Sequence, residues 1–151
     1  MKLEFLMSYR PNLGAALDVG VGQYGNRLIF EIDGGEFEGP KLKGTIRKAG
    51  CADWITMCED YAHLDVRVTF ETHDGAFIYV EYIGRFELTP GVRAALAGEG
   101  ETDFGEANCF NSPRLQTGDD RYKWVNNIVC AGEGRIRQGR VEYNVYQVVN
   151  G

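Results

Sequence analysis

The stretch that decides the fold is Leu64–Phe86, LDVRVTFETHDGAFIYVEYIGRF. It contains two runs rich in β-branched and aromatic residues, separated by Asp74-Gly75. Such runs predict strands over Leu64–Thr72 and Ala76–Phe86, and Asp-Gly between two strands favours a two-residue type I′ turn. The segment is therefore predicted to form an antiparallel β-hairpin.

A two-residue turn would determine which residues oppose one another across the hairpin. It would pair Thr72 with Phe77 and Phe70 with Tyr79, and directly opposed side chains share a face. One face would be mostly apolar and comprise Leu64, Val66, Val68, Phe70, Phe77, Tyr79, Glu81 and Ile83. The other would be mixed and comprise Asp65, Arg67, Thr69, Glu71, Ile78, Val80 and Tyr82. Periodicity leaves two interpretations open: the mixed face meets solvent, or it lines the interior of a ligand-binding barrel.

Short β-rich runs punctuated by glycine continue on both sides of the hairpin. Further strands are predicted over Lys2–Tyr9, Arg27–Ile32, Lys41–Arg47, Trp124–Ala131 and Val141–Val149. One short helix is predicted near Pro90–Ala97, because Thr89 can cap it, proline suits the first helical position and Gly98 can end it. Regularly spaced short strands are typical of an all-β sandwich or barrel, and the length suits one domain over 1–151.

Composition and charge restrict the class of partner. The net charge is −6, and the 16 Lys and Arg residues are scattered, which argues against nucleic acid and against an anionic membrane surface. No apolar stretch approaches the roughly 20 residues of a membrane span, and the amino-terminal apolar run is too short for a signal peptide. We therefore expect a cytoplasmic protein with no nucleic-acid or membrane partner.

The sequence contains partial matches to cofactor and metal motifs, but the neighbouring residues do not have the structure or spacing that these motifs need. Gly20–Gly25, GVGQYG, fits the dinucleotide fingerprint, but Arg27–Ile32 after it is predicted to be a strand and not the helix that this fingerprint needs. The four cysteines have no zinc-site spacing and are predicted to be reduced and mostly buried, with Cys51 the most exposed because it lies in a Gly-rich turn. No cofactor and no metal are predicted.

Two places outside the hairpin combine a polar group with a tryptophan. In the first, Asp53 and Trp54 follow a Gly-rich bend, so Asp53 is either a desolvated carboxylate with a raised pKa or a turn acid bonded to nearby backbone. In the second, Trp124, Asn126 and Ile128 would share one face of a strand. Asn126 would there either orient a ligand carbonyl or satisfy a buried backbone group.

Several motifs, taken in order, resemble the pattern of one family. They are Gly25–Arg27, Gly34–Pro40, Gly44, Gly50–Trp54, Leu64–Arg67, Asp74–Ala76, Tyr122–Asn126 and Val141–Tyr146. The pattern is similar to the domain-of-unknown-function family 3237 over nearly the whole chain. The resemblance implies a compact antiparallel β-barrel, similar to calycins and allene-oxide-cyclase-like barrels, with shared motif residues Asp53, Trp54, Asp65, Arg67, Trp124 and Asn126.

One segment departs from the family's pattern. Within Phe110–Thr117, the residues Asn111 and Gln116 stand where the family usually carries an Arg and a Glu. If those charges help to hold a ligand in the family, the ligand of this chain is different or less charged.

The resemblance also favours the mixed face of the hairpin as the barrel interior, which would bind a small hydrophobic or aromatic molecule. In an enzyme of isomerase, cyclase or lyase type, Arg67 would stabilise an oxyanion and Asp53 or Asp65 would move a proton. Asn126 would orient a carbonyl group of the substrate. Residues that would stack on a cyclic or aromatic substrate are Trp54, Tyr82 and Trp124.

Two alternatives to an enzyme stay open. In a non-catalytic carrier or sensor of a small hydrophobic ligand, the same residues would supply affinity only. In a subunit of an assembly, an aromatic surface would pair with another chain and would appear as a large exposed apolar patch. A homodimer is possible in each case.

Overall fold

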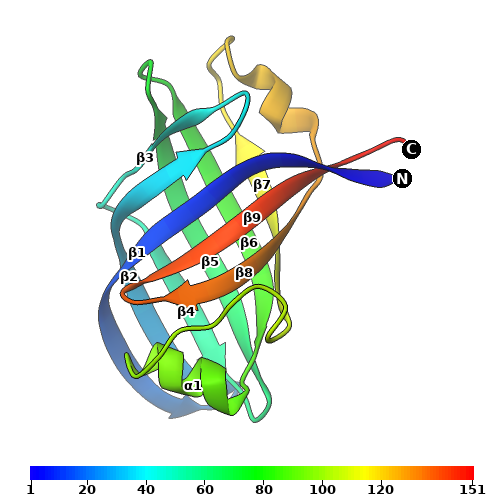
Figure 1. Ribbon diagram of the computed structural model, residues 1–151. Helices are drawn as coiled ribbons and strands as arrows, with labels where there is room; N and C mark the ends of the chain where they lie inside the picture. The colour runs from blue at the N-terminus through cyan, green and yellow to red at the C-terminus, as the bar shows by residue number, and fades with distance from the viewer.

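The computed structural model of the protein describes residues 1–151. Nine β-strands make up most of it, with one short α-helix and one 3-10 helix (Figure 1). In chain order the elements are β1 (Lys2–Gly22), β2 (Gly25–Glu38), β3 (Lys43–Ile46), β4 (Ala52–Met57), β5 (Tyr61–Thr72), β6 (Phe77–Glu87), α1 (Pro90–Leu96), β7 (Cys109–Gln116), η1 (Lys123–Asn127), β8 (Cys130–Arg137) and β9 (Arg140–Val149). Neither helix has the length and apolar character needed to cross a membrane.

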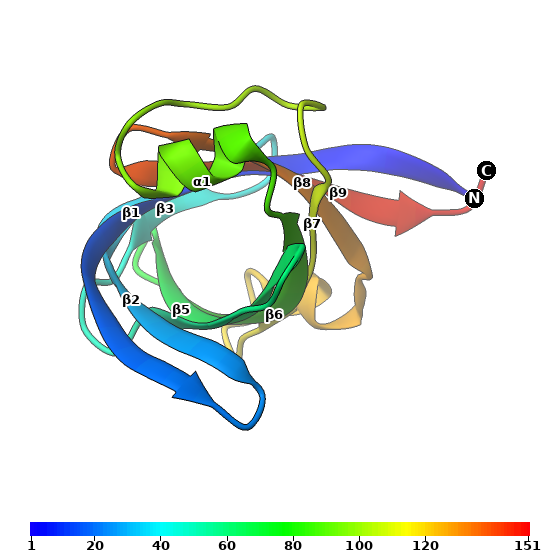
Figure 2. The same cartoon turned by 90° about the horizontal axis from the view of Figure 1, so that it is seen from below.

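The strands form one antiparallel sheet that closes on itself. Their order is β1-β9-β8-β7-β6-β5-β3-β2-β4, and additional pairings join β1 to β2 and β5 to β4. Figure 2 shows the resulting ring from below. The strands from the two ends of the chain, β1 and β9, pair with each other as part of this ring. The prediction of an all-β antiparallel barrel is confirmed.

The short helix α1 is also confirmed, and it lies at the lower end of the barrel (Figures 1 and 2). Its amino terminus is capped by Thr89, whose hydroxyl oxygen accepts the N–H of Val92 at 3.1 Å. Several apolar side chains that pack on the core are only partly buried, and in β1, β2, β4 and α1 they are Leu13, Leu28, Phe30, Met57 and Leu96.

The β5–β6 hairpin forms, but its loop has three residues instead of two. Thr72 donates its N–H to the carbonyl of Ala76 at 2.9 Å, and Gly75 adopts a left-handed conformation with a φ of 90°. Three-residue hairpin loops use glycine at such a position. The carboxylate of Asp74 accepts hydrogen bonds from the hydroxyls of Thr72 and Tyr122, both at 2.7 Å, which stabilise this loop. The predicted two-residue turn is wrong.

The longer loop moves the residues of β6 by one position relative to β5. Phe70 therefore pairs with Ile78 and not with Tyr79. The face that points into the barrel is buried and comprises Leu64, Val66, Val68, Phe70, Ile78, Val80, Tyr82 and Phe86. Asp65 and Arg67 lie on the outer face. The prediction that their mixed face lines the interior is wrong, because the observed register puts apolar side chains inside and charged ones outside.

Two smaller expectations also fail. The segment Trp124–Ala131 is not one strand, because η1 occupies its first half and β8 begins only at Cys130. Cys51 is buried and only 5% exposed, although its glycine-rich neighbourhood predicted the most exposed thiol. The partly exposed thiol is that of Cys58, and all four cysteines are free.

Candidate functional site

Asp53 points into the barrel from β4. Its partners across the sheet are Phe30 on β2 and Val66 on β5, which both pack in the core, and opposed residues share a face. The residue is partly buried. Its Oδ1 atom accepts the backbone N–H of Asp65 at 3.1 Å, and its other carboxylate oxygen accepts no hydrogen bond from the protein.

Burial controls the ionisation of Asp53. Loss of hydration raises the pKa of its carboxyl group to about 7, and the negative charge of Asp65 adds to the rise. The hydrogen bond from the backbone of Asp65 and the positive charge of Arg27 act in the opposite direction. Of the two interpretations of Asp53, the structure favours the desolvated carboxylate over the turn acid.

Three tyrosines meet in the barrel interior near this carboxyl group. Tyr9 on β1, Tyr82 on β6 and Tyr143 on β9 are all buried, with ring centroids 5.7 to 6.0 Å apart. The hydroxyl of Tyr82 donates to the hydroxyl of Tyr9 at 3.4 Å. Burial raises the pKa of each phenol, and the negative charge of Asp53 adds to that rise. The phenols are therefore neutral at physiological pH and can donate hydrogen bonds.

The tyrosine cluster was only partly predicted. Tyr82 is a candidate in the sequence, but Tyr9 and Tyr143 are not. A signal for Tyr143 was present, since it alternates with apolar residues at Val141 and Val145 on a predicted strand. No local signal joins Tyr9 to Tyr143, because their proximity depends on the pairing of the first strand with the last.

Three other predicted residues meet on the outside of the barrel. The Asp65 carboxylate and the Arg67 guanidinium are 3.7 Å apart, with side chains 48% and 47% exposed. The guanidinium of Arg67 also lies over the indole of Trp54, 5.3 Å from the ring centroid. Because the sheet separates this outer group from the interior, Arg67 and Asp53 do not face a common space.

The last two predicted residues lie on η1 at the upper end of the barrel (Figure 1). Trp124 packs partly on the core, and the Lys41 ammonium lies 5.6 Å from its ring centroid. The side-chain amide of Asn126 accepts the backbone N–H of Thr117 at 2.8 Å and donates to its carbonyl at 3.0 Å. Asn126 therefore satisfies backbone groups, the second of the two interpretations that its sequence left open.

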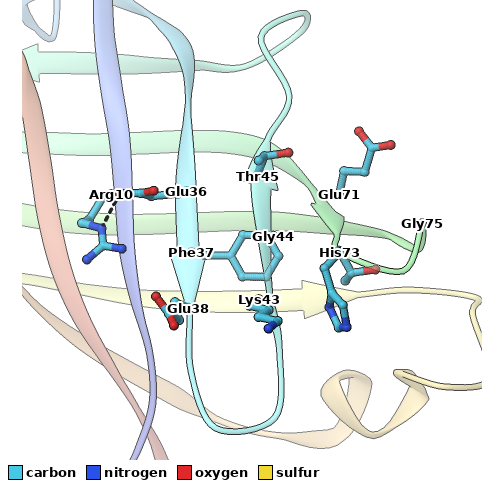
Figure 3. Close-up of a pocket in the computed structure, with 11 residues that line it drawn as sticks. Arg10, Glu36, Phe37, Glu38, Lys43, Gly44, Thr45, Glu71, His73 and Gly75 are labelled. Atoms are coloured by element: carbon cyan, nitrogen blue, oxygen red, sulfur yellow. Dashed lines mark ion pairs between the residues drawn. The ribbon is translucent and has the colours of Figure 1, made fainter.

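The two hollows described first do not include any residue of this interior cluster. A groove of about 440 Å³ runs along β1, β2, β3 and β5 and is lined mainly by charged and polar residues, with Arg10 and Glu36 paired at 3.1 Å (Figure 3). A larger hollow of about 800 Å³ lies beside Trp54 and the 48–51 loop. Neither of these two is lined by Asp53 or by the tyrosines. A third hollow of about 490 Å³ is lined by Asp65, Arg67 and, from the cluster, Tyr82.

A closed antiparallel barrel with one carboxyl group and three phenols inside defines a β-barrel protein with a polar centre. The chain belongs to the family described as Protein of unknown function (DUF3237), whose model matches residues 1–148. This confirms the family that the sequence motifs predicted.

Individual relatives agree with this assignment. The chain is 28% identical to the UPF0311 protein RPA1785 of Rhodopseudomonas palustris over 150 residues, covering 99% of this chain and 97% of the relative. The crystal structure of RPA1785 matches with a TM-score of 0.88 at 27% identity, over 99% of each chain. A beta-barrel like protein from Acinetobacter baumannii AYE matches with a TM-score of 0.81 at 30% identity, over 97% of this chain and 94% of that one.

A more distant structure shares the fold alone. It is that of an enzyme from Penicillium herquei, with a TM-score of 0.70 at 20% identity, over 98% of this chain and 94% of that one. The barrel architecture therefore extends to at least one protein described as an enzyme.

Proposed function

We propose that the barrel interior binds a small cyclic or aromatic carbonyl compound and that Asp53 transfers a proton to or from it. The reaction would be of isomerase, cyclase or lyase type. The observation that carries the proposal is the environment of Asp53, a partly buried carboxyl group that faces the interior and has a pKa of about 7. Such a group is available in both protonation states near neutral pH, so it can accept a proton and return it.

The neighbouring groups supply the rest of this chemistry. Ionised Asp53 would take a proton from a carbon next to the substrate carbonyl, and the C–H electron pair would form an enolate. A phenol of the tyrosine cluster would donate a hydrogen bond to the oxygen that gains the negative charge. Protonated Asp53 would then return the proton, either to another carbon or to a leaving group.

The proposal uses Asp53 and Tyr82 among the residues predicted from the sequence. It leaves out Asp65, Arg67 and Trp54, because they lie on the outer face of the barrel. Trp124 and Asn126 are left out as well, because they lie on η1 and the amide of Asn126 is engaged with backbone. The distant enzyme with the same fold is consistent with a catalytic barrel.

One observation favours a carrier or sensor as the second candidate. Oδ1 of Asp53 already accepts a backbone hydrogen bond from Asp65, and a partly satisfied carboxylate is compatible with a purely binding role. In that case the interior would hold the same ligand without moving a proton.

The test separates binding from proton transfer. A library of cyclic and aromatic carbonyl compounds is screened by thermal unfolding, since a ligand of the native state raises the transition temperature. Each hit is then incubated with the protein in D₂O, and loss of the proton next to its carbonyl is followed by NMR. We expect the wild type to accelerate this exchange and Asp53→Asn to slow it by about 100-fold or more while still binding the compound.

Asp65→Asn is the matched control, because Asp65 was the alternative proton carrier. We expect it to keep the exchange activity. Its pH profile should move to lower pH, because the charge of Asp65 helps to raise the pKa of Asp53. Hits that bind without any exchange would support the carrier, and an unchanged rate in Asp53→Asn would rule out the proposed proton transfer.

A further inference from the structure

The interior contains a buried amide that the protein leaves without partners. Asn111 on β7 is 5% exposed, and neither its Oδ1 nor its Nδ2 atom makes a hydrogen bond. Burying both ends of a carboxamide unpaired is costly, and such a group in a folded protein requires an explanation. The alternating burial along β7 puts its side chain on the same face as Cys109 and Leu115, which belong to the core.

The strands beside Asn111 make room for this amide. Its partners across the sheet are Gly84 on β6 and Gly132 on β8. A Cβ atom at Gly132 would lie 2.2 Å from Oδ1 of Asn111, and one at Gly84 would lie 3.1 Å from its Cβ. Neither glycine has a positive φ. The lack of space for a side chain, and not the backbone conformation, therefore explains why glycine stands at these two positions. The amide therefore packs directly against the two neighbouring strands, and a larger residue at either glycine would collide with it.

The same part of the barrel, on β7 and β8, also contacts the tyrosine cluster. A Cβ atom at Gly134 would lie 2.6 Å from both Sγ of Cys109 and the ring of Tyr143. The negative charge of Asp53 contributes to the raised pKa of Tyr143, so this phenol lies within electrostatic range of Asp53. Asn111, two residues beyond Cys109 on the same face, thus borders the interior that Asp53 faces.

The charge of the interior further restricts the class of ligand that can bind there. No Lys or Arg is among the buried residues, whereas Asp53 faces the interior. An anionic ligand would be repelled by ionised Asp53, and Arg27, the cation that acts on this carboxyl group, already donates to the backbone carbonyl of Trp54. The interior therefore suits an uncharged molecule.

We propose that Asn111 is the specificity-determining residue of the barrel site, and that it pairs with an uncharged ligand carrying a hydrogen-bond donor and an acceptor side by side. This inference rests on the proposed function for the position of the ligand. A carboxamide presents one N–H donor face and one carbonyl acceptor, so its complement is another donor–acceptor pair, as in a lactam or a hydroxyl group beside a carbonyl. A ligand of this kind satisfies both orphan atoms at once.

The first test compares each ligand with its methylated partner. Bicyclic lactams such as 2-quinolone, and aromatic hydroxy-ketones, are titrated against the wild type together with their N- or O-methyl derivatives, which keep the acceptor and lose the donor. We expect the best parent compounds to bind at least about tenfold more tightly than their methylated partners. If no parent binds more tightly than its derivative, a buried water or nothing satisfies Asn111, and the proposal is overturned.

The second test assigns this preference to Asn111. In Asn111→Leu the parent and the methylated compound should bind with similar affinity, because the amide is gone. Gln116→Leu makes the same change at an exposed position of β7 and should retain the preference. A preference that survives in Asn111→Leu would overturn the proposal.

A third measurement uses the wild type alone, so that misfolding of Asn111→Leu cannot affect the result. The side-chain NH₂ resonances of Asn111 in the wild type, followed by ¹⁵N NMR, should shift on addition of a parent compound and stay in place with its methylated partner. Unmoved resonances at saturation would equally overturn the proposal.

The test of Asn111 does not depend on whether Asp53 transfers a proton. Asp53→Asn should keep the preference for parent compounds although it loses exchange. A preference that depends on Asn111, with no exchange of any bound compound, would mean that the site stands and the catalytic function fails. Exchange that depends on Asp53, with no role for Asn111, would mean the reverse.

Discussion

The carboxyl group of Asp53 opposes folding at the pH at which it would be most useful. Its pKa rises from 3.8 to about 7 in the folded protein. Between these values the folded protein keeps a proton that the unfolded chain has lost, so stability falls as the pH rises from about 4 to about 7 and then levels off. In Asp53→Asn this component is absent. We expect the variant to gain up to roughly 4 kcal/mol relative to wild type across this range, measured by urea unfolding from about pH 4 to pH 8. Asp33→Asn, at an exposed site, leaves Asp53 in place and should keep the fall in stability seen in the wild type.

At the scale of the element, the β5–β6 loop decides which faces of two strands are buried. Gly75 has a φ of 90°, and no atom lies within 4 Å of the position of its missing Cβ. Gly75→Ala would fit the space but strain the backbone, so we expect it to lower the free energy of unfolding by about 1–2 kcal/mol in urea. Gly75→Asn should cost less, because Asn tolerates the left-handed conformation. Gly118→Ala, with open space and no positive φ, is the control, and an equal cost at both positions would contradict the loop conformation.

At the scale of the whole molecule, strands from the two ends of the chain close the barrel. Met7 on β1 is 1% exposed and pairs with Val145 on β9, which is fully buried. We expect Met7→Ala to lower the free energy of unfolding by about 2–5 kcal/mol, whereas Leu3→Ala, at an exposed position of the same strand, should change it little. Circular dichroism and fluorescence of Trp54 and Trp124 should report one common transition, because no strand can leave the ring alone. Separate transitions would contradict a barrel that unfolds as a unit.

The candidate site shows how far sequence patterns reach. Asp53 and Tyr82 were predicted as site residues, and both face the interior, although Asp53 was assigned to a bend and Tyr82 to the same face as Arg67. Arg67 was expected beside them and lies outside, since its face depended on a loop length that differs by one residue from the favoured turn. Tyr9, Tyr143 and Asn111 were not predicted as a group, because they come from strands far apart in the chain.

The sequence by itself determined most of the strands, the β5–β6 hairpin, one capped helix, an all-β barrel and the family, but it did not predict β4 or β7. These depend on local periodicity, on turn and capping residues, and on motifs in a given order. Only the tertiary structure decided what those elements enclose. Strand register and the pairing of β1 with β9 determine which face of each strand is buried. A shift of one residue in register exchanges the buried and the exposed faces. That is why Asp53, the tyrosines and Asn111 share the interior while Asp65 and Arg67 meet solvent.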